Sequence, residues 1–114
     1  MMLRASIEET GADYKLDGVI GHGDGGIPHG AILIEFAESA IADDAARLSS
    51  ARENVRKTLG SEKLVDAAAI VATFNAIDRV ADATGTPIDE ARLEPSAEMR
   101  AQLGIDQFPS AAAS

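Results

Sequence analysis

The sequence predicts an all-α protein, a small bundle of about four or five helices. Three observations predict this fold class. Apolar residues recur with the helical period through the middle of the chain, no segment alternates with the period of a strand, and glycine or proline separates the periodic segments. The chain has 114 residues, the size of one domain, so we expect a single helical domain over residues 1–114.

Residues 1–28 are predicted to form a short N-terminal helix followed by a glycine-rich loop. A mild helical pattern places the helix around residues 12–20. The segment GHGDGGIPHG, residues 21–30, contains five glycines and a proline. Because glycine costs backbone entropy inside a helix, this segment is predicted to be a loop.

Residues 29–92 are predicted to be the helical core. In residues 29–42, one apolar face follows the i, i+1, i+4, i+5 rhythm of a helix. Its members are Ile32, Leu33, Phe36, Ala37, Ala40 and Ile41. The next helix is capped by Asp43 or Asp44 and ends at Gly60. The turn at these two aspartates predicts an antiparallel hairpin of the two helices.

A third helix is predicted over residues 62–84, where Gly85 and Pro87 end it. It is the longest predicted element and the most apolar, so we expect it to be central and buried. Ser96 suits the start of a short terminal helix. Residues 105–114 are predicted to be an extended and partly disordered tail.

The composition implies a weak core. The chain contains twenty-two alanines, and only 4% of its residues are aromatic. Alanine buries little surface, and a lone domain of this size buries only about two thirds of its unfolded surface. We therefore expect the bundle to be completed by assembly into a homo-oligomer.

Charge and cysteine content exclude several classes of function. The formal net charge is −9, which argues against a nucleic-acid partner and against an anionic membrane surface, because both bind clustered Lys and Arg. Cysteine is absent, which excludes disulfides, thiol nucleophiles and Cys-ligated metals. No apolar run reaches about 18 residues and no signal-peptide pattern is present, so a cytoplasmic protein without a membrane partner is expected.

Four polar residues interrupt the apolar third helix: Asn75, Asp78, Arg79 and Asp82, here named the polar patch. At about 100° per residue, all four fall within roughly 100° of one another on one face, so they can pair among themselves. An exposed stripe is the preferred interpretation, in which each pair is worth only roughly 0.3–0.5 kcal/mol. A buried structural network and a ligand site are the alternatives.

The glycine-rich loop carries a second candidate group: His22, Asp24 and His29. Imidazoles and carboxylates are metal ligands, and glycine-rich turns can offer backbone N–H groups to an anion. The spacing matches no metal or phosphate motif. A connector with incidental histidines is preferred, so neither a metal nor a cofactor is predicted. Metal binding, anion binding and proton transfer by a histidine are the alternatives.

Residues 59–89, LGSEKLVDAAAIVATFNAIDRVADATGTPID, resemble the C-terminal helical hairpin of the carboxymuconolactone decarboxylase and alkylhydroperoxidase D-like superfamily. The first matching motif comprises Gly60, Leu64, Val65, Asp66 and Ala67. The second comprises Phe74, Asn75, Arg79, Ala81, Gly85, Pro87, Ile88 and Asp89. The preceding helix is also similar, so the resemblance covers residues 28–89.

The resemblance implies an all-α fold and assembly into dimers, trimers or hexamers. In redox members of that family a Cys-x-x-Cys-x-x-x-His element does the chemistry. This chain has no cysteine, so thiol peroxidase activity is excluded. The acid/base residues of decarboxylase members have no match here, so no catalytic residue is carried over. Asn75 and Arg79 match the helix pattern and are expected to be structural.

Three hypotheses about function follow. The leading one is a cysteine-less, alkylhydroperoxidase D-like helical oligomer of unassigned biochemical function. The second is a carboxymuconolactone decarboxylase-like lyase, in which a loop histidine transfers protons and Arg79 holds a small carboxylate ligand. The third is a non-catalytic helical subunit whose partner is a different chain.

Overall fold

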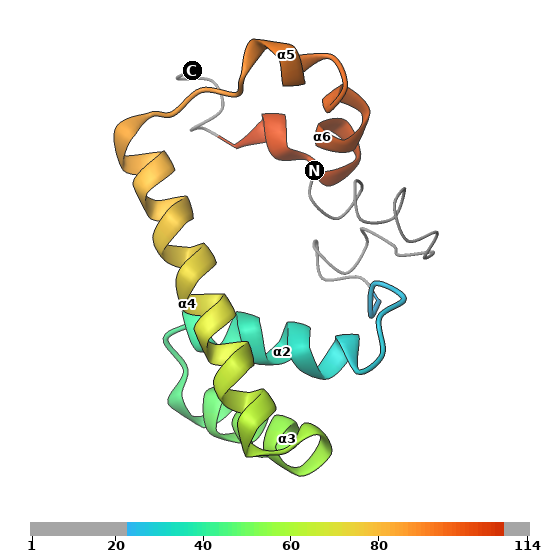
Figure 1. Cartoon of the computed structure of the whole chain (residues 1–114), viewed down its shortest axis with the longest axis vertical. Coiled ribbons are helices and arrows are strands. Elements are labelled where there is room, and N and C mark those ends of the chain that lie inside the picture. The colour runs from blue at the N-terminus through green and yellow to red at the C-terminus, as the bar shows by residue number, and fades with distance from the viewer. Residues whose placement is uncertain (1–22, 109–114) are drawn as a thin grey trace. The chain divides into compact units, whose positions relative to one another are not determined.

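The computed structural model describes residues 23–108, which fold into helices and turns with no strand among them (Figure 1). The elements are α2 (Gly30–Ile41), α3 (Ala45–Leu59), α4 (Ser61–Thr84), α5 (Glu90–Leu93), α6 (Ala97–Leu103) and the 3₁₀ turn η2 (Ile105–Gln107). The all-α prediction is therefore confirmed for this range. The helix expected around residues 12–20 and the end of the tail, residues 109–114, lie outside the described residues.

The described residues fall into two compact units, 23–76 and 77–108, and each is described by itself. Helix α4 contributes its first sixteen residues to one unit and its last eight to the other. The expectation of one domain over residues 1–114 stays a prediction.

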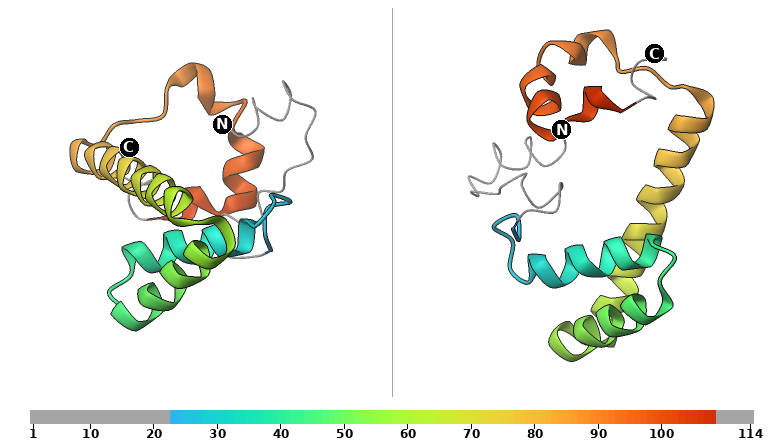
Figure 2. Two further views of the ribbon diagram at one scale, coloured as in Figure 1. Left: turned by 60° about the horizontal axis from the view of Figure 1, so that its bottom comes forward. Right: turned by 180° about the vertical axis from the view of Figure 1, so that it is seen from behind.

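In the first unit, α2 and α3 form the predicted helical hairpin and lie side by side (Figures 1 and 2). Of the two candidate caps, Asp44 is the one used: its Oδ1 accepts a hydrogen bond of 2.9 Å from the backbone N–H of Arg47. This satisfies one of the amides that a helix start leaves unpaired. At the other end α3 stops at Gly60, whose φ of 91° is a conformation that glycine adopts readily.

The core between these helices is small. Phe36, Ala51 and Val55 are its buried apolar members, with Val55 fully buried. Ser39 is also fully buried, and its hydroxyl donates to the carbonyl oxygen of Phe36 at 2.9 Å, so its burial leaves no unsatisfied group. Partly buried apolar side chains surround this centre: Ile32, Leu48, Leu59, Leu64 and Ala67.

An ion-pair cluster ties α2 to α3 beside this core. The guanidinium of Arg47 donates to both carboxylate oxygens of Glu35, at 2.7 and 2.8 Å, and to Glu38 at 2.8 Å. The two-pronged contact is the strong geometry for an arginine and a carboxylate. The hydrogen bond from Arg47 lowers the pKa of Glu35, and the same contacts raise the pKa of Arg47. The hairpin is therefore held by charge as well as by packing.

The expectation that the third helix is buried is wrong for α4. None of its residues is buried, and its large apolar side chains remain well exposed, namely Val65, Ile70, Phe74, Ile77 and Val80. Only one side of its N-terminal half, including Leu64 and Ala67, packs against the core of the hairpin. The reason is geometric: α4 is apolar around most of its circumference, and one hairpin can cover only one stripe of it.

The second unit holds the short C-terminal elements. Helix α5 was not predicted; Asp89 begins it by accepting a hydrogen bond from Ala91 N–H. Helix α6 follows Ser96 as predicted. Within the predicted tail of residues 105–114, Ile105–Gln107 form the turn η2 and Asp106 is bonded to Arg100. That side-chain contact fixes a segment whose local sequence carries little helical signal.

Truncating the centre of the core tests this packing. Val55→Ala should lower the free energy of unfolding by about 2–3 kcal/mol, because two buried methyl groups are lost and a cavity remains. Val65→Ala makes the same change at a side chain that is 67% exposed and should shift stability by no more than about 0.5 kcal/mol. Urea unfolding followed by helical circular dichroism measures both. Equal losses would contradict this description of the core.

The Arg47 cluster predicts a pH dependence. The pKa of Glu35 is lowered on folding, so its contribution to stability is complete above its unfolded pKa of about 4.5 and disappears as the pH falls through the folded pKa. The destabilisation caused by Arg47→Met should therefore be largest near neutral pH and shrink below about pH 4.5. Arg52→Met, an exposed arginine of the same helix, is the control. A pH-independent difference between wild type and Arg47→Met would rule out this role.

Candidate functional site

The polar patch lies on α4 as predicted, and three of its members, Asp78, Arg79 and Asp82, are exposed while Asn75 is half-buried. The internal ladder expected from the spacing is not formed: in residues 23–108 no ion pair joins Arg79 to either aspartate. Asn75 and Arg79 do have interaction partners. The exposure favours the interpretation as a solvent-facing stripe over a buried network.

The described part of the glycine-rich loop is held by its own backbone. Asp24 accepts a hydrogen bond of 2.9 Å from Gly26 N–H, and its carbonyl oxygen accepts one from Ile27 N–H. Gly30 packs so closely on this turn that a Cβ there would lie 2.0 Å from the carbonyl oxygen of Asp24. The carboxylate of Asp24 therefore has a local structural task, as expected for a connector.

The two histidines of the loop give no assembled site. His29 is exposed and adopts a left-handed φ of 59° immediately before α2, which is uncommon for a residue other than glycine. His22 lies outside the described residues. In residues 23–108, no group of three or more His, Cys, Asp or Glu side chains is placed to hold a metal ion. The metal, anion and proton-transfer alternatives stay predictions.

A cavity of about 540 Å³ has all of its described lining residues in the second unit, and we name it the C-terminal cavity. The end of α4, the following loop, α5, α6 and η2 all contribute to its walls. Its lining residues are Ala81, Asp82, Gly85, Thr86, Pro87, Ile88, Leu93, Arg100, Ile105, Asp106 and Phe108. Most are apolar, with a few polar groups among them, which is the usual make-up of a small-molecule site. Of the polar patch, Asp82 alone is in this lining.

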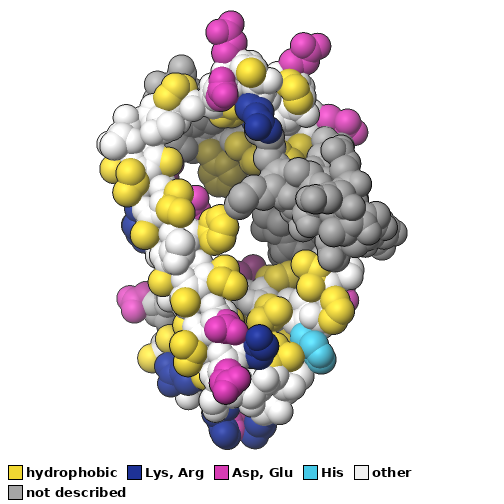
Figure 3. Space-filling model, in the orientation of Figure 1, with side chains coloured by type: hydrophobic (Ala, Val, Ile, Leu, Met, Phe, Trp, Pro, Cys, Tyr) yellow, Lys and Arg dark blue, Asp and Glu magenta, His cyan; other side chains and the backbone are white. Residues whose placement is uncertain are grey.

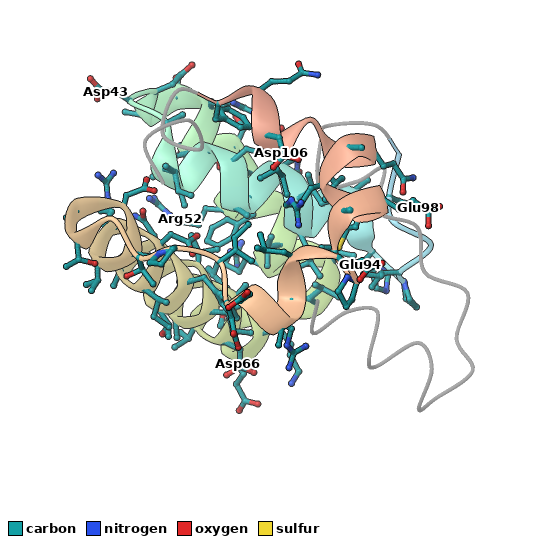
Figure 4. All side chains as sticks on the ribbon, turned by 90° about the horizontal axis from the view of Figure 1, so that it is seen from above. Asp43, Arg52, Asp66, Glu94, Glu98 and Asp106 are labelled. Carbon is teal, nitrogen blue, oxygen red and sulfur yellow. The ribbon has the colours of Figure 1, made fainter. Side chains whose placement is uncertain are left out.

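Arg100 is the most strongly positioned charge of the cavity. Its side chain is only 14% exposed. Nε donates to Asp106 at 3.0 Å, and Nη1 donates to the carbonyl oxygen of Leu93 at 2.8 Å and to the hydroxyl of Ser96. Asp106, labelled in Figure 4, lies in η2, whereas Arg100 lies in α6. Arg100 therefore clamps α5, α6 and η2 together, and its charge is balanced by Asp106.

The sequence analysis missed both Arg100 and Asp106. The sequence signal was an arginine in a short helix, followed six residues later by an aspartate with Gly104 between them. In the structure Gly104 has a left-handed φ of 68°. Such a pair forms only if the chain reverses at the glycine, and helical periodicity does not reveal that reversal.

The first unit contains an apolar groove of about 400 Å³ between α2 and the N-terminal half of α4. It is lined by Leu33, Phe36, Ala37, Leu59, Lys63, Asp66, Ala67, Ile70 and Val71. Its charged members stand at the edge, since Lys63 and Asp66 form an exposed pair at 3.3 Å, and Asp66 points outward in Figure 4. The groove offers apolar contact without a reactive group.

Across the described helices, none has the length and apolar character needed to span a membrane. No protein-family model, no curated protein and no solved structure matches this chain. The likeness of residues 59–89 to the alkylhydroperoxidase D-like superfamily therefore stays a prediction from sequence.

Proposed function

We propose that this chain is a non-catalytic helical subunit, alkylhydroperoxidase D-like and cysteine-less, that acts by assembling with a second copy of itself. The lack of cysteine rules out thiol peroxidase chemistry. The proposal is supported by the resemblance of residues 59–89, by the small core of the helical hairpin and above all by the exposed apolar face of α4.

That face has the spacing of a helix–helix seam. Along α4, apolar residues recur at alternating steps of three and four, in the order Ala67, Ile70, Phe74, Ile77 and Ala81. We name these residues the α4 seam. Such spacing lines one face of a helix and is the pattern by which two helices interlock. Ile70, Phe74 and Ile77 are 59%, 46% and 57% exposed, and Figure 3 shows hydrophobic side chains exposed along α4.

The order of residues in the α4 seam favours a second copy as its partner. The order reads alanine, isoleucine, phenylalanine, isoleucine, alanine, and is the same in both directions. An antiparallel pair with a two-fold axis at Phe74 sets each isoleucine against an isoleucine and each alanine against an alanine. A symmetric dimer requires this kind of self-complementary surface.

The strength of such a pair can be bounded. Fully burying one Ile or Phe side chain is worth roughly 1.5–3 kcal/mol. Since the three large seam residues are already half-buried, the two copies together gain on the order of 5–9 kcal/mol before the cost of association. A micromolar dissociation constant needs about 8 kcal/mol. Since association costs roughly 4 kcal/mol or more, the α4 seam alone falls short of this value, and a micromolar dimer needs further contacts such as those of the neighbouring groove.

The lyase alternative lacks a supporting observation. It needs a loop histidine and Arg79 at one site. Arg79, the residue that would hold the carboxylate, does not line the C-terminal cavity.

Light scattering over a concentration series tests the proposed assembly. The wild type should move from monomer to dimer as concentration rises, and Phe74→Asp should remain monomeric because it places a charge at the centre of the α4 seam. Val65→Asp, on the opposite side of α4 and 67% exposed, should dimerise like the wild type.

Three outcomes would overturn the proposal. One is a wild type that is monomeric throughout the series, and another is an oligomer insensitive to Phe74→Asp. The third is co-purification of a different chain in fixed ratio, which would favour a heteromeric partner for this face.

A further inference from the structure

The charges of the C-terminal cavity leave one carboxylate without a partner. Arg100 and Asp106 satisfy each other at 3.0 Å. No side chain in residues 23–108 forms an ion pair with Asp82, the remaining charged residue of the lining. Among the described lining residues, the three ionised groups therefore sum to one negative charge, and most of the others are apolar.

Helix α4 adds to this negative potential. Asp82 lies in the last turn of a helix that ends at Thr84, and that turn contains no basic residue. The C-terminal end of a helix dipole is negative, so a carboxylate there is unfavourable and a cation is favourable. Asp82 and the C-terminal end of α4 thus both make the electrostatic potential at this wall of the cavity more negative.

The rest of the wall provides apolar contact. Ile88, Leu93, Ile105 and Phe108 line the cavity and are 43%, 44%, 36% and 61% exposed. These side chains have surface left for a ligand to cover, which is worth roughly 25 cal/mol per Å². Phe108 also brings an aromatic ring, whose face attracts cations.

We propose that the C-terminal cavity binds a small organic cation, a protonated amine attached to an apolar body. The ammonium group donates to Asp82 at the end of α4, and the apolar body covers Leu93, Ile105 and Phe108. A small carboxylate is the wrong sign for this wall, because Arg100 is already neutralised by Asp106. The net charge of −9 on the whole chain also attracts cations.

Calorimetric titration of the full chain with a matched set of probes tests the proposal. Benzylamine, charged at pH 7, should bind, whereas benzyl alcohol and benzoate, of similar size, should bind much more weakly. Asp82→Asn should weaken benzylamine binding roughly tenfold or more, the effect of losing one charged hydrogen bond. Asp78→Asn, the same change one turn earlier and outside the lining, should keep the affinity within about twofold.

A second measurement separates a lost site from a damaged fold. Without amine, Asp82→Asn should melt at the same temperature as the wild type or slightly higher, because an unfavourable charge leaves the helix end. Benzylamine should raise the melting temperature of the wild type and of Asp78→Asn but not that of Asp82→Asn.

Several results would overturn the proposal. If benzyl alcohol bound as tightly as benzylamine, the site would recognise only the apolar part of the ligand. Tighter binding of benzoate would show an anion site at Arg100. Equal losses in the two asparagine variants would show general attraction to an acidic protein, and no binding of benzylamine to the wild type would remove the site.

Discussion

The rest of the structure depends on the close packing of α2 on α3. Ala51 and Ser39 are small and buried at this contact, and Phe36 and Val55 fill the remaining space. Small residues allow two helix backbones to approach, but they leave little apolar area to bury. The Arg47 cluster at the same contact adds charge pairing to this limited packing. A hairpin built in this way has no capacity left to enclose a long third helix.

The exposure of α4 is the direct consequence. The hairpin covers the side of α4 that carries Leu64 and Ala67. Ala67, one end of the α4 seam, therefore lies on the covered side, while Ile70, Phe74 and Ile77 remain exposed. The polar patch occupies part of the circumference near the C-terminal end, where Asp78 lies one turn after the seam residue Phe74. One helix therefore offers three different surfaces: one packed, one apolar and exposed, and one polar. The proposed assembly uses the second, while Asp82 of the third reaches the wall of the C-terminal cavity.

Local sequence signals were enough to predict most helices. Apolar periodicity located α2, α3 and α4, and glycine at positions 60 and 85 marked two of their ends. The sequence could not show which of Asp43 and Asp44 caps α3, because both are aspartates and either can accept the capping hydrogen bond. Burial was the main error: periodicity shows that a face is apolar, but not whether this chain supplies the surface that covers it.

The contacts that shape the candidate sites were harder to predict, since they join residues on different elements. Arg47 reaches back across a turn to Glu35, and Arg100 reaches forward across Gly104 to Asp106. Neither pair has a helical i, i+3 or i, i+4 spacing, so neither stands out in the sequence. The polar patch shows the reverse case, because its spacing permits a ladder of ion pairs that the described structure does not form.

The turn in the loop before α2 depends on a close contact between two backbone positions. Its closest approach is backbone against backbone, where the hydrogen on the Cα of Gly30 faces the carbonyl of Asp24. The shape of the turn thus requires that position 30 carry no side chain, and Gly25 and Gly26, with φ of 70° and 71°, also adopt conformations that favour glycine. A glycine at that position is a better marker of this loop than either histidine.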